Sequence, residues 1–217
     1  MAGSLRADII QVIKAKFEND CISLLLESYR ALVATNHNFQ SFSENDITAQ
    51  LVGHMKNNPK RQNLKISIKR ENHLDSQETY AGNAKADESP RIDITYTVWS
   101  DKDEYEYHME AKNLAENNWK KEGAKTKVDA GKLHKRYIAT GIGNFLDGKY
   151  QNGCLLGYIL QGSTKEVVAK INRLLEGGNR KKEVLVEQNS DAGSYYISRH
   201  SNTPAPLLKH FLLSFSN

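Results

Sequence analysis

The segment from Pro90 to Lys112, PRIDITYTVWSDKDEYEYHMEAK, holds the strongest structural signal in this chain. Apolar and polar residues alternate with a period of two over residues 91–99 and again over residues 104–113, which is typical of half-buried strands. Residues 100–103, SDKD, separate the two runs with a composition that favours a tight turn. The segment therefore predicts an antiparallel β-hairpin.

Charged side chains of both predicted strands should share one face of this hairpin. In the second strand, Glu110 and Lys112 lie on the face opposite to Tyr107 and Met109. Asp93 lies on the polar face of the first strand, so antiparallel pairing brings it close to Glu110. Two carboxylates at short range repel each other unless a cation lies between them. Mg²⁺, for which Mn²⁺ is a substitute, prefers oxygen ligands of this kind.

Such a cluster would suit the hydrolysis of a phosphodiester bond. Mg²⁺ bound by Asp93 and Glu110 would lower the pKa of a water molecule and offset charge on the phosphate. Lys112 would orient that water or stabilise the phosphorus centre. The alternative is an ordinary solvated sheet face with cross-strand salt bridges. His108 shares the face, as a structural neighbour or as a contact to substrate or water.

The segments before the hairpin predict helices and one more strand. Ser43 is a suitable N-cap and Asp46 follows it at the spacing of a capping box, so a helix should begin there and end near residues 57–59. The other expected elements are a helix in one piece or two over residues 5–34, a strand over 64–69 and a polar loop over 75–89.

The segments after the hairpin predict a crossover back to the sheet. The apolar run CLLGYIL at residues 154–160 suits a strand buried on both faces. Gly141 and Gly143 weaken the helix before it, and glycines are best tolerated where a helix must approach a sheet closely. The other expected elements are helices over residues 129–146, 164–176 and 204–215 and strands over 184–186 and 195–197. Hairpin strands followed by a crossover predict an α/β fold whose mixed central sheet is flanked by helices.

Composition narrows the class of protein. The 217 residues are 39% hydrophobic and 26% charged, which indicates one globular domain over residues 1–217. No apolar run approaches the ~20 residues of a membrane helix, and the first residues do not resemble a secretory signal. Cys21 and Cys154 have no metal-ligand or redox partner nearby in the sequence, so we expect reduced cysteines and a cytoplasmic location.

The net charge of +4 is concentrated in residues 56–70 and 112–136, which are either solvated faces or phosphate-binding segments.

The residues of the predicted acidic cluster resemble a known sequence signature. Pro90–Asp93, then sixteen intervening residues and Glu110-Ala111-Lys112, is similar to the signature of the PD-(D/E)xK nucleases. That resemblance implies a restriction-endonuclease-like fold with an αβββαβ core, which residues 43–162 match in element order. Residues 1–40 would be a helical N-terminal extension, and residues 163–217 would complete the fold with helix and strand.

The resemblance also implies a function. It predicts a Mg²⁺-dependent endonuclease acting on double-stranded DNA, in restriction, phage defence or repair. Asp93 and Glu110 would bind the metal, Lys112 would be catalytic, and Glu44 stands where the family often has an additional acid. The motif's proline is not adjacent to Asp93, which leaves Asp87 or Glu88 as the alternative acid.

Further residues have two interpretations each. Trp119 would stack on a base or anchor a loop, and Lys132 and Arg136 would bind phosphate or line a solvated helix edge. A homodimer would fit double-strand cutting, with the N-terminal 34 residues or the apolar C-terminus as its interface. Two other functions stay open: an inactive nucleic-acid-binding module on the same fold, and a protein-interaction subunit.

Overall fold

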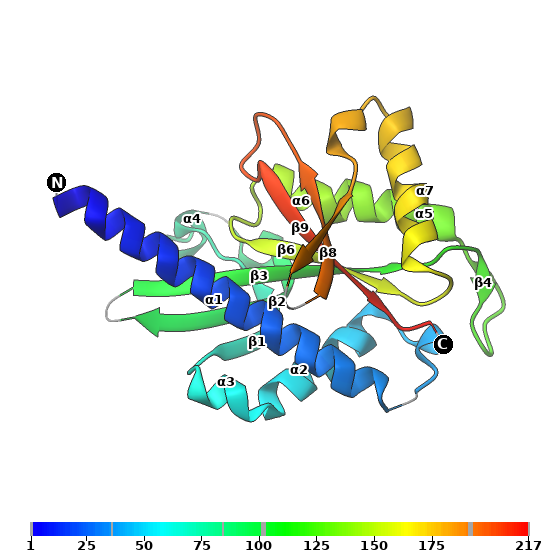
Figure 1. Ribbon diagram of the computed structural model, residues 1–217, viewed down its shortest axis with the longest axis horizontal. Coiled ribbons are helices and arrows are strands. Elements are labelled where there is room, and N and C mark those ends of the chain that lie inside the picture. Colours follow the sequence, from blue (N-terminus) through cyan, green and yellow to red (C-terminus); the bar gives the residue numbers. More distant parts are fainter. Residues whose placement is uncertain (1, 36, 84, 101–102, 191–192, 217) are drawn as a thin grey trace.

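The computed structural model describes residues 2–35, 37–83, 85–100, 103–190 and 193–216. Within these residues the chain forms a seven-stranded mixed sheet with the order β1-β2-β3-β6-β9-β8-β7 (Figure 1). Strand β6 pairs in parallel with β3 and with β9, and the other neighbouring strands pair antiparallel. The strands are β1 (Ser67–His73), β2 (Arg91–Ser100), β3 (Asp103–Leu114), β6 (Gly153–Ile159), β7 (Val186–Ser190), β8 (Gly193–Arg199) and β9 (Leu207–Ser214).

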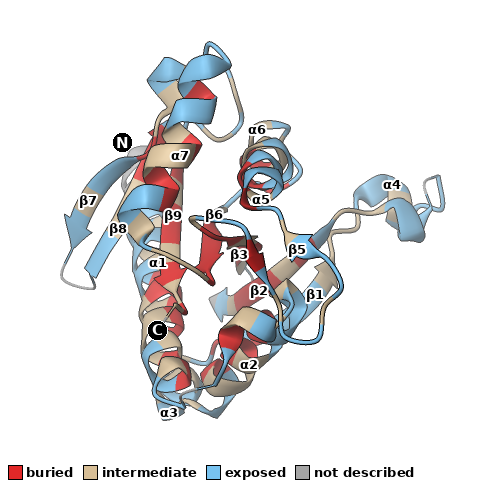
Figure 2. Cartoon of the chain, turned by 90° about the vertical axis from the view of Figure 1, so that its right-hand side faces the viewer, coloured by how far each residue is buried: buried red, intermediate tan, exposed pale blue. Residues whose placement is uncertain are grey.

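Helices cover both faces of this sheet, as predicted for a mixed α/β fold. One face packs against α1 (Ala2–Val33) and α2 (Glu44–Asn57), whose apolar side chains share a core with β2 and β3. The opposite face packs against η3 (Tyr137–Ile142), α6 (Gly143–Leu146) and α7 (Thr164–Gly177). Buried residues accordingly concentrate along β3, β6 and β9, between the helical layers (Figure 2).

Short elements connect these layers. They are η1 (Phe39–Ser41), α3 (Pro59–Asn63), α4 (Gln77–Tyr80), η2 (Ala86–Glu88), β4 (Trp119–Lys120), β5 (Lys127–Val128), α5 (Ala130–Arg136) and η4 (Lys181–Glu183). None of the helices in the described ranges is both long enough and apolar enough to cross a membrane. Cys21 and Cys154 are buried and unbonded to each other.

The predicted hairpin is confirmed. Strands β2 and β3 pair from Ile94↔Met109 to Ser100↔Asp103. The two central residues of the predicted turn, Asp101 and Lys102, lie outside the described residues. The odd-numbered apolar residues of β3, among them Met109, are buried against the α1–α2 layer as alternation requires.

The predicted start of helix α2 is also confirmed. The Ser43 hydroxyl accepts a hydrogen bond from the Asp46 backbone N–H at 3.2 Å, and the Asp46 carboxylate accepts one from the Ser43 N–H at 2.8 Å. This reciprocal pair is a capping box with Asp in place of Glu, and it satisfies two of the donors that a helix start leaves free. The box places Glu44 at the first position of the helix, next to the end of β3.

The closing helix predicted over residues 204–215 is wrong, because Leu207–Ser214 form strand β9. Leu and Lys favour a helix in isolation, but β9 lies between β6 and β8 and pairs with both. This pairing buries Leu208, Phe211 and Leu213. Burial in the sheet interior outweighs intrinsic helix propensity, which differs by less than about 1 kcal/mol per residue among these side chains.

Smaller differences have local causes. The first strand begins at Ser67 and not at residue 64, because Pro59–Asn63 forms a helical turn and Lys65 has a left-handed backbone (φ 55°). Helix α1 runs through Asn19 and Asp20 without a break. Strand β7 begins at Val186, later than expected, and residues 75–89 include the short helices α4 and η2.

The helix expected over residues 129–146 is present but contains a π-helical segment. It starts as α5, continues as the six π-helical residues of η3 and ends as α6. Gly141 lies where a Cβ would come within 3.0 Å of a methyl group of Leu155 on β6 and 3.5 Å of the Lys112 side chain. The expectation that a glycine permits close approach to the sheet is therefore confirmed at Gly141.

A chain of buried polar side chains crosses the second half of the sheet. Tyr137 of η3 contacts His210 of β9 (2.8 Å), and His210 contacts Ser198 of β8 (2.8 Å). Ser198 also contacts His200 (2.7 Å), whose other ring nitrogen bonds to Glu183. Burial lowers the pKa of His210 to about 3, so its neutral form is part of this hydrogen-bonded chain.

Candidate functional site

Asp93 on β2 is held against strand β3 at a point where the predicted alternation of β2 is interrupted, because Ile94 packs on the α1–α2 face of the sheet and Ile92 on the opposite face. Asp93 Oδ2 accepts a hydrogen bond of 2.7 Å from the backbone N–H of Ala111, the residue between Glu110 and Lys112. The paired register of β2 and β3 ends at Ile94↔Met109, and Asp93 lies close enough to Glu110 to raise the pKa of that carboxyl. Asp93, Glu110 and Lys112 thus come together. The alternative acids do not join them, because Asp87 and Glu88 are exposed in η2 and Glu88 pairs with Lys85 at 3.4 Å.

Lys112 is buried and lies between carboxylates. Its Nζ donates to Glu110 Oε1 and to the Ala111 carbonyl oxygen (2.7 Å), and it lies 3.6 Å from Glu44 Oε1. Only 6% of the Lys112 side chain and 8% of the Glu110 side chain are exposed. Charges this deeply buried have little water around them, so the ammonium interacts strongly with both carboxylates.

Glu44 links three elements at this site. One carboxylate oxygen accepts a 3.0 Å hydrogen bond from the backbone N–H of Asn113 on β3. The other lies 3.2 Å from the Arg136 guanidinium of α5 and 3.6 Å from Lys112. Since Glu44 is the first residue of α2, the helix start fixes this carboxylate beside the end of β3.

The site is short of positive charge. Burial is the main reason that the pKa of Glu110 rises to about 7, and the nearby Asp93 carboxylate raises it further against the opposing effect of Lys112. Burial likewise raises the pKa of Asp93, with Glu44 and Glu71 adding to the rise and Lys112 opposing it. Both carboxyl groups would therefore gain from an additional cation.

The oxygen donors here fit a weakly chelated Mg²⁺ and do not form a dedicated metal cage. No group of three or more His, Cys, Asp or Glu side chains within the described ranges is close enough to share a metal ion. Mg²⁺ commonly uses only one or two carboxylates and keeps several waters. Asp93 and Glu110 are the pair that would bind it, once both carboxyl groups are deprotonated.

Tyr150 is a member of the site that the sequence analysis missed. Its hydroxyl donates to the Arg91 carbonyl oxygen at 2.7 Å and accepts from the Asn144 amide at 3.3 Å. Burial and the nearby Glu110 carboxylate raise the pKa of Tyr150. Tyr150 precedes β6, whose parallel pairing with β3 brings it to Glu110, and that pairing had no local sequence signal beyond the apolar run of β6.

Two polar groups beside the site are buried and lack a hydrogen-bond partner among the described residues. They are Thr95 Oγ1 on β2 and His108 Nδ1 on β3, which face each other as a register pair. The other ring nitrogen of His108 lies 3.3 Å from Glu106. Burial lowers the pKa of His108, so this side chain is a neutral neighbour of the acidic cluster.

The expected nucleic-acid residues have different environments. Trp119 is 8% exposed and donates to the Gln40 carbonyl oxygen at 3.3 Å, so it anchors a loop and has no free ring face for base stacking. Arg136 is half exposed and pairs with Glu44. Lys132 is exposed on α5, one turn before Arg136.

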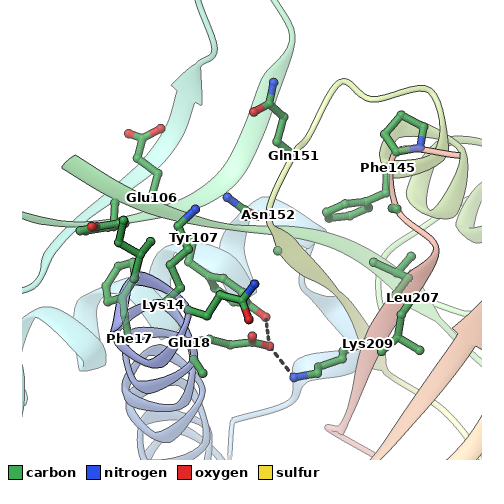
Figure 3. Close-up of a pocket in the computed structure, with 18 of the residues that line it drawn as sticks. Lys14, Phe17, Glu18, Glu106, Tyr107, Phe145, Gln151, Asn152, Leu207 and Lys209 are labelled. Atoms are coloured by element: carbon green, nitrogen blue, oxygen red, sulfur yellow. Dashed lines mark hydrogen bonds and ion pairs between the residues drawn. The ribbon is translucent and has the colours of Figure 1, made fainter. Parts of the chain in front are cut away.

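A large hollow lies elsewhere on the molecule. It has a volume of about 840 Å³ and lies between α1, the first residues of β3 and the loop before β9. Inside it, Glu18 accepts hydrogen bonds from Tyr107 (3.1 Å) and Lys209 (2.7 Å), as Figure 3 shows. Tyr107 points to the face of β3 opposite to Glu110, so this hollow does not open onto the acidic cluster.

No protein-family model, curated protein or solved structure matches this chain. Inference about function therefore depends on the geometry of the site.

Proposed function

We propose that this protein is a metal-dependent nuclease that hydrolyses phosphodiester bonds, as an endonuclease acting on DNA. The observation that carries the proposal is the convergence of Asp93, Glu110, Lys112 and Glu44 from two strands and one helix start. Three carboxylates and one buried ammonium at a sheet surface form a set that suits phosphoryl chemistry.

The surrounding elements support a restriction-endonuclease-like core over residues 43–162. Helix α2 is followed by the antiparallel meander β1-β2-β3, then by the helical segment α5 to α6, and then by β6 parallel to β3. This is the αβββαβ order that the resemblance to PD-(D/E)xK nucleases implies, and the motif residues lie on its second and third strands.

Each residue has a role in this proposal. Asp93 and Glu110 would hold Mg²⁺, which when bound would acidify a water molecule and offset phosphate charge. Lys112, fixed between Glu110 and Glu44, would orient the attacking water and stabilise the phosphate in the transition state. Glu44 positions Lys112 and Arg136 through its two short contacts.

A specific observation favours a second candidate, a nucleic-acid-binding module without activity. Lys112 already pairs with Glu110 and contacts Glu44, so the cluster is partly neutralised without a metal ion. In that case the buried pairs would serve stability alone, and metal ions would have no effect on the protein.

The test is a plasmid-nicking assay with Mg²⁺, Mn²⁺ or EDTA. We expect metal-dependent cutting by the wild type, and a loss of about a hundredfold or more in Asp93→Asn and Lys112→Met. Two controls remove a like side chain from an exposed strand position: Glu104→Gln on β3 and Lys69→Met on β1 should cut normally. Folded wild type that cuts neither DNA nor RNA with either metal would reject the nuclease and favour the binding module.

A further inference from the structure

One segment beside the candidate site has a larger net positive charge than the whole protein. Residues 119–136 carry seven bases and two acids, a net charge of +5 against +4 for the entire chain, so the remaining residues sum to −1. Six exposed cations define what we call the basic surface: Lys120, Lys125 and Lys127 of the β4–β5 hairpin, Lys132 and Lys135 of α5, and Arg173 of α7. In the described ranges none of the six forms a salt bridge with a carboxylate.

The β4–β5 hairpin is held firmly at its base. Trp119 is buried there and bonds to Gln40, and the Lys121 ammonium donates to the Phe42 carbonyl oxygen at 2.7 Å. On the other side the Asn118 side chain accepts from the Ala130 N–H at 2.8 Å. The hairpin is thus fixed to the body on both sides, while its three other lysines are exposed to solvent. It would therefore lose little backbone conformational entropy when these lysines bind a ligand.

The basic surface includes a pocket between α5 and α7. Its volume is about 720 Å³, and Lys135 and Arg173 line it from opposite helices. The carboxylate that lines it, Glu116, already accepts hydrogen bonds from the Ser163 N–H and the Asn117 amide, both at 3.1 Å. The pocket therefore has two unpaired cations and a carboxylate that is satisfied by other groups, which is a suitable environment for an anion.

Helix α5 joins this pocket to the candidate site. Arg136 points from α5 to Glu44, while its neighbour Lys135 points to the pocket. Glu116 lies two residues beyond the end of β3 and four residues beyond Lys112, which corresponds to about 13 Å of extended chain. A chain of phosphates could therefore extend from the acidic cluster onto the basic surface.

We propose that the basic surface binds the phosphodiester backbone of a duplex, outside the bond that is cut. This proposal rests on the nuclease proposal for its setting and deepens it. The absence of a stacking group favours a duplex over a single strand, because Trp119, the aromatic residue within 119–136, is buried. Lysines and arginines without aromatic partners recognise backbone charge and shape, not base sequence.

The test measures binding and not cutting. A 20-bp DNA duplex, the matching RNA duplex and the DNA single strand would be titrated in EDTA over a range of salt concentrations. Lys120→Ala/Lys125→Ala/Lys127→Ala and Lys135→Ala/Arg173→Ala should each bind duplex roughly tenfold to a hundredfold more weakly than wild type at 0.1 M salt. The slope of log K against log salt should fall by about 0.9 for each contact removed.

A matched control removes the same kind of charge far away. Lys14→Ala/Lys16→Ala changes two exposed lysines of α1, whose N-terminal end lies at the opposite end of the molecule from β4 (Figure 1), and should bind within twofold of wild type. Preference for the DNA or the RNA duplex would identify which backbone is bound. The proposal is overturned if the hairpin variant keeps wild-type affinity and salt slope, if the α1 control loses as much, or if single strands bind better than both duplexes.

The outcomes separate this proposal from the nuclease proposal. Wild type that binds duplex through these residues but never cuts would leave the basic surface established and reject the nuclease. Metal-dependent cutting by the wild type, with unchanged duplex binding in both basic-surface variants, would support the nuclease and reject the basic surface as the binding site.

Discussion

The Glu44 carboxylate accepts a hydrogen bond from the backbone N–H of Asn113, the residue that follows Lys112 on β3. This bond joins the first residue of α2 to the strand that carries Glu110 and Lys112. The other oxygen of the same carboxylate is left to interact with Lys112 and Arg136. One side chain therefore serves both the packing of a helix on the sheet and the charge balance of the site.

These two roles of Glu44 can be separated by substitution. Glu44→Ala leaves the Asn113 N–H without an acceptor and should lower the free energy of unfolding by about 1–3 kcal/mol. Glu44→Gln keeps an acceptor oxygen but removes the charge, so it should lose less stability while still reducing any cleavage. Urea unfolding and plasmid nicking of both variants would check this. Equal stability losses in the two variants would show that the charge, and not the hydrogen bond, matters for folding.

Glu110 should make the stability of the protein depend on pH. Its pKa in the folded protein is about 7, above the ordinary value of 4.5, so the folded state binds a proton more tightly than the unfolded state. The resulting stabilisation is complete below about pH 4.5 and is lost as the pH rises through 7, a change of roughly 3 kcal/mol at most. Glu110→Gln should remove this part of the pH dependence. The measurement is urea unfolding in EDTA at pH 5.5 and pH 8, with Glu104→Gln as the control.

The same titration predicts how Mg²⁺ should act. Protons compete with the metal for Glu110, so Mg²⁺ should raise the melting temperature of the wild type more at pH 8 than at pH 5.5. Thermal unfolding with and without Mg²⁺ tests this without any cleavage assay. A shift of the same size in Asp93→Asn/Glu110→Gln would mean that the metal binds elsewhere.

The titration of His210 should contribute to the loss of stability at acid pH. Its folded pKa of about 3 lies below the ordinary 6.5, so the folded state binds fewer protons than the unfolded state between these values. Its contribution is present above about pH 6.5 and is lost progressively as the pH falls toward 3. His210→Asn should be less stable at pH 7, because Tyr137 and Ser198 lose a partner, but should show a flatter decline in acid. Acid unfolding of wild type and His210→Asn would be followed by circular dichroism. The same decline with pH in both proteins would show that another group dominates the acid unfolding.

Two glycines on helices should respond oppositely to alanine. Gly53 in α2 has no atom within 4 Å of an added Cβ, so Gly53→Ala should stabilise the protein by about 0.5–1 kcal/mol. At Gly141 the added methyl would press on Leu155 and approach Lys112. Gly141→Ala should therefore not stabilise the protein and should reduce cleavage. Melting temperatures and nicking rates of the pair test whether this segment is close-packed on the site.

Features encoded by local signals were predictable from the sequence. The capping box of Ser43 and Asp46 specifies where α2 begins, and alternation specifies that Glu110 and Lys112 share one face of β3. The position of Asp93 was only partly predictable, because the alternation of β2 is interrupted between Ile92 and Ile94. Asp93 is placed beside Glu110 by the hydrogen bond that its carboxylate accepts from the Ala111 N–H.

Features that depend on distant partners were not predictable in this way. The residues of β9 have no strand-specific pattern, and only the gap between β6 and β8 makes them extended. Tyr150 reaches Glu110 through the parallel pairing of β6 with β3. The contact of Arg136 with Glu44 requires α5 and α2 to pack at the same end of β3. Each of these depends on packing between elements far apart in sequence.

The position of β9 has a consequence for synthesis on the ribosome. Among the described strands β9 is the last in sequence, yet it fills the interior of the sheet and connects the β7–β8 hairpin to β6. Until residues 207–214 have left the exit tunnel, the apolar strand β6 has an open edge and β7–β8 has nothing to pair with. The hairpin with Asp93 and Glu110 can form much earlier. We therefore expect the nascent chain to pass through a half-built sheet that is prone to aggregation and is a natural client for chaperones.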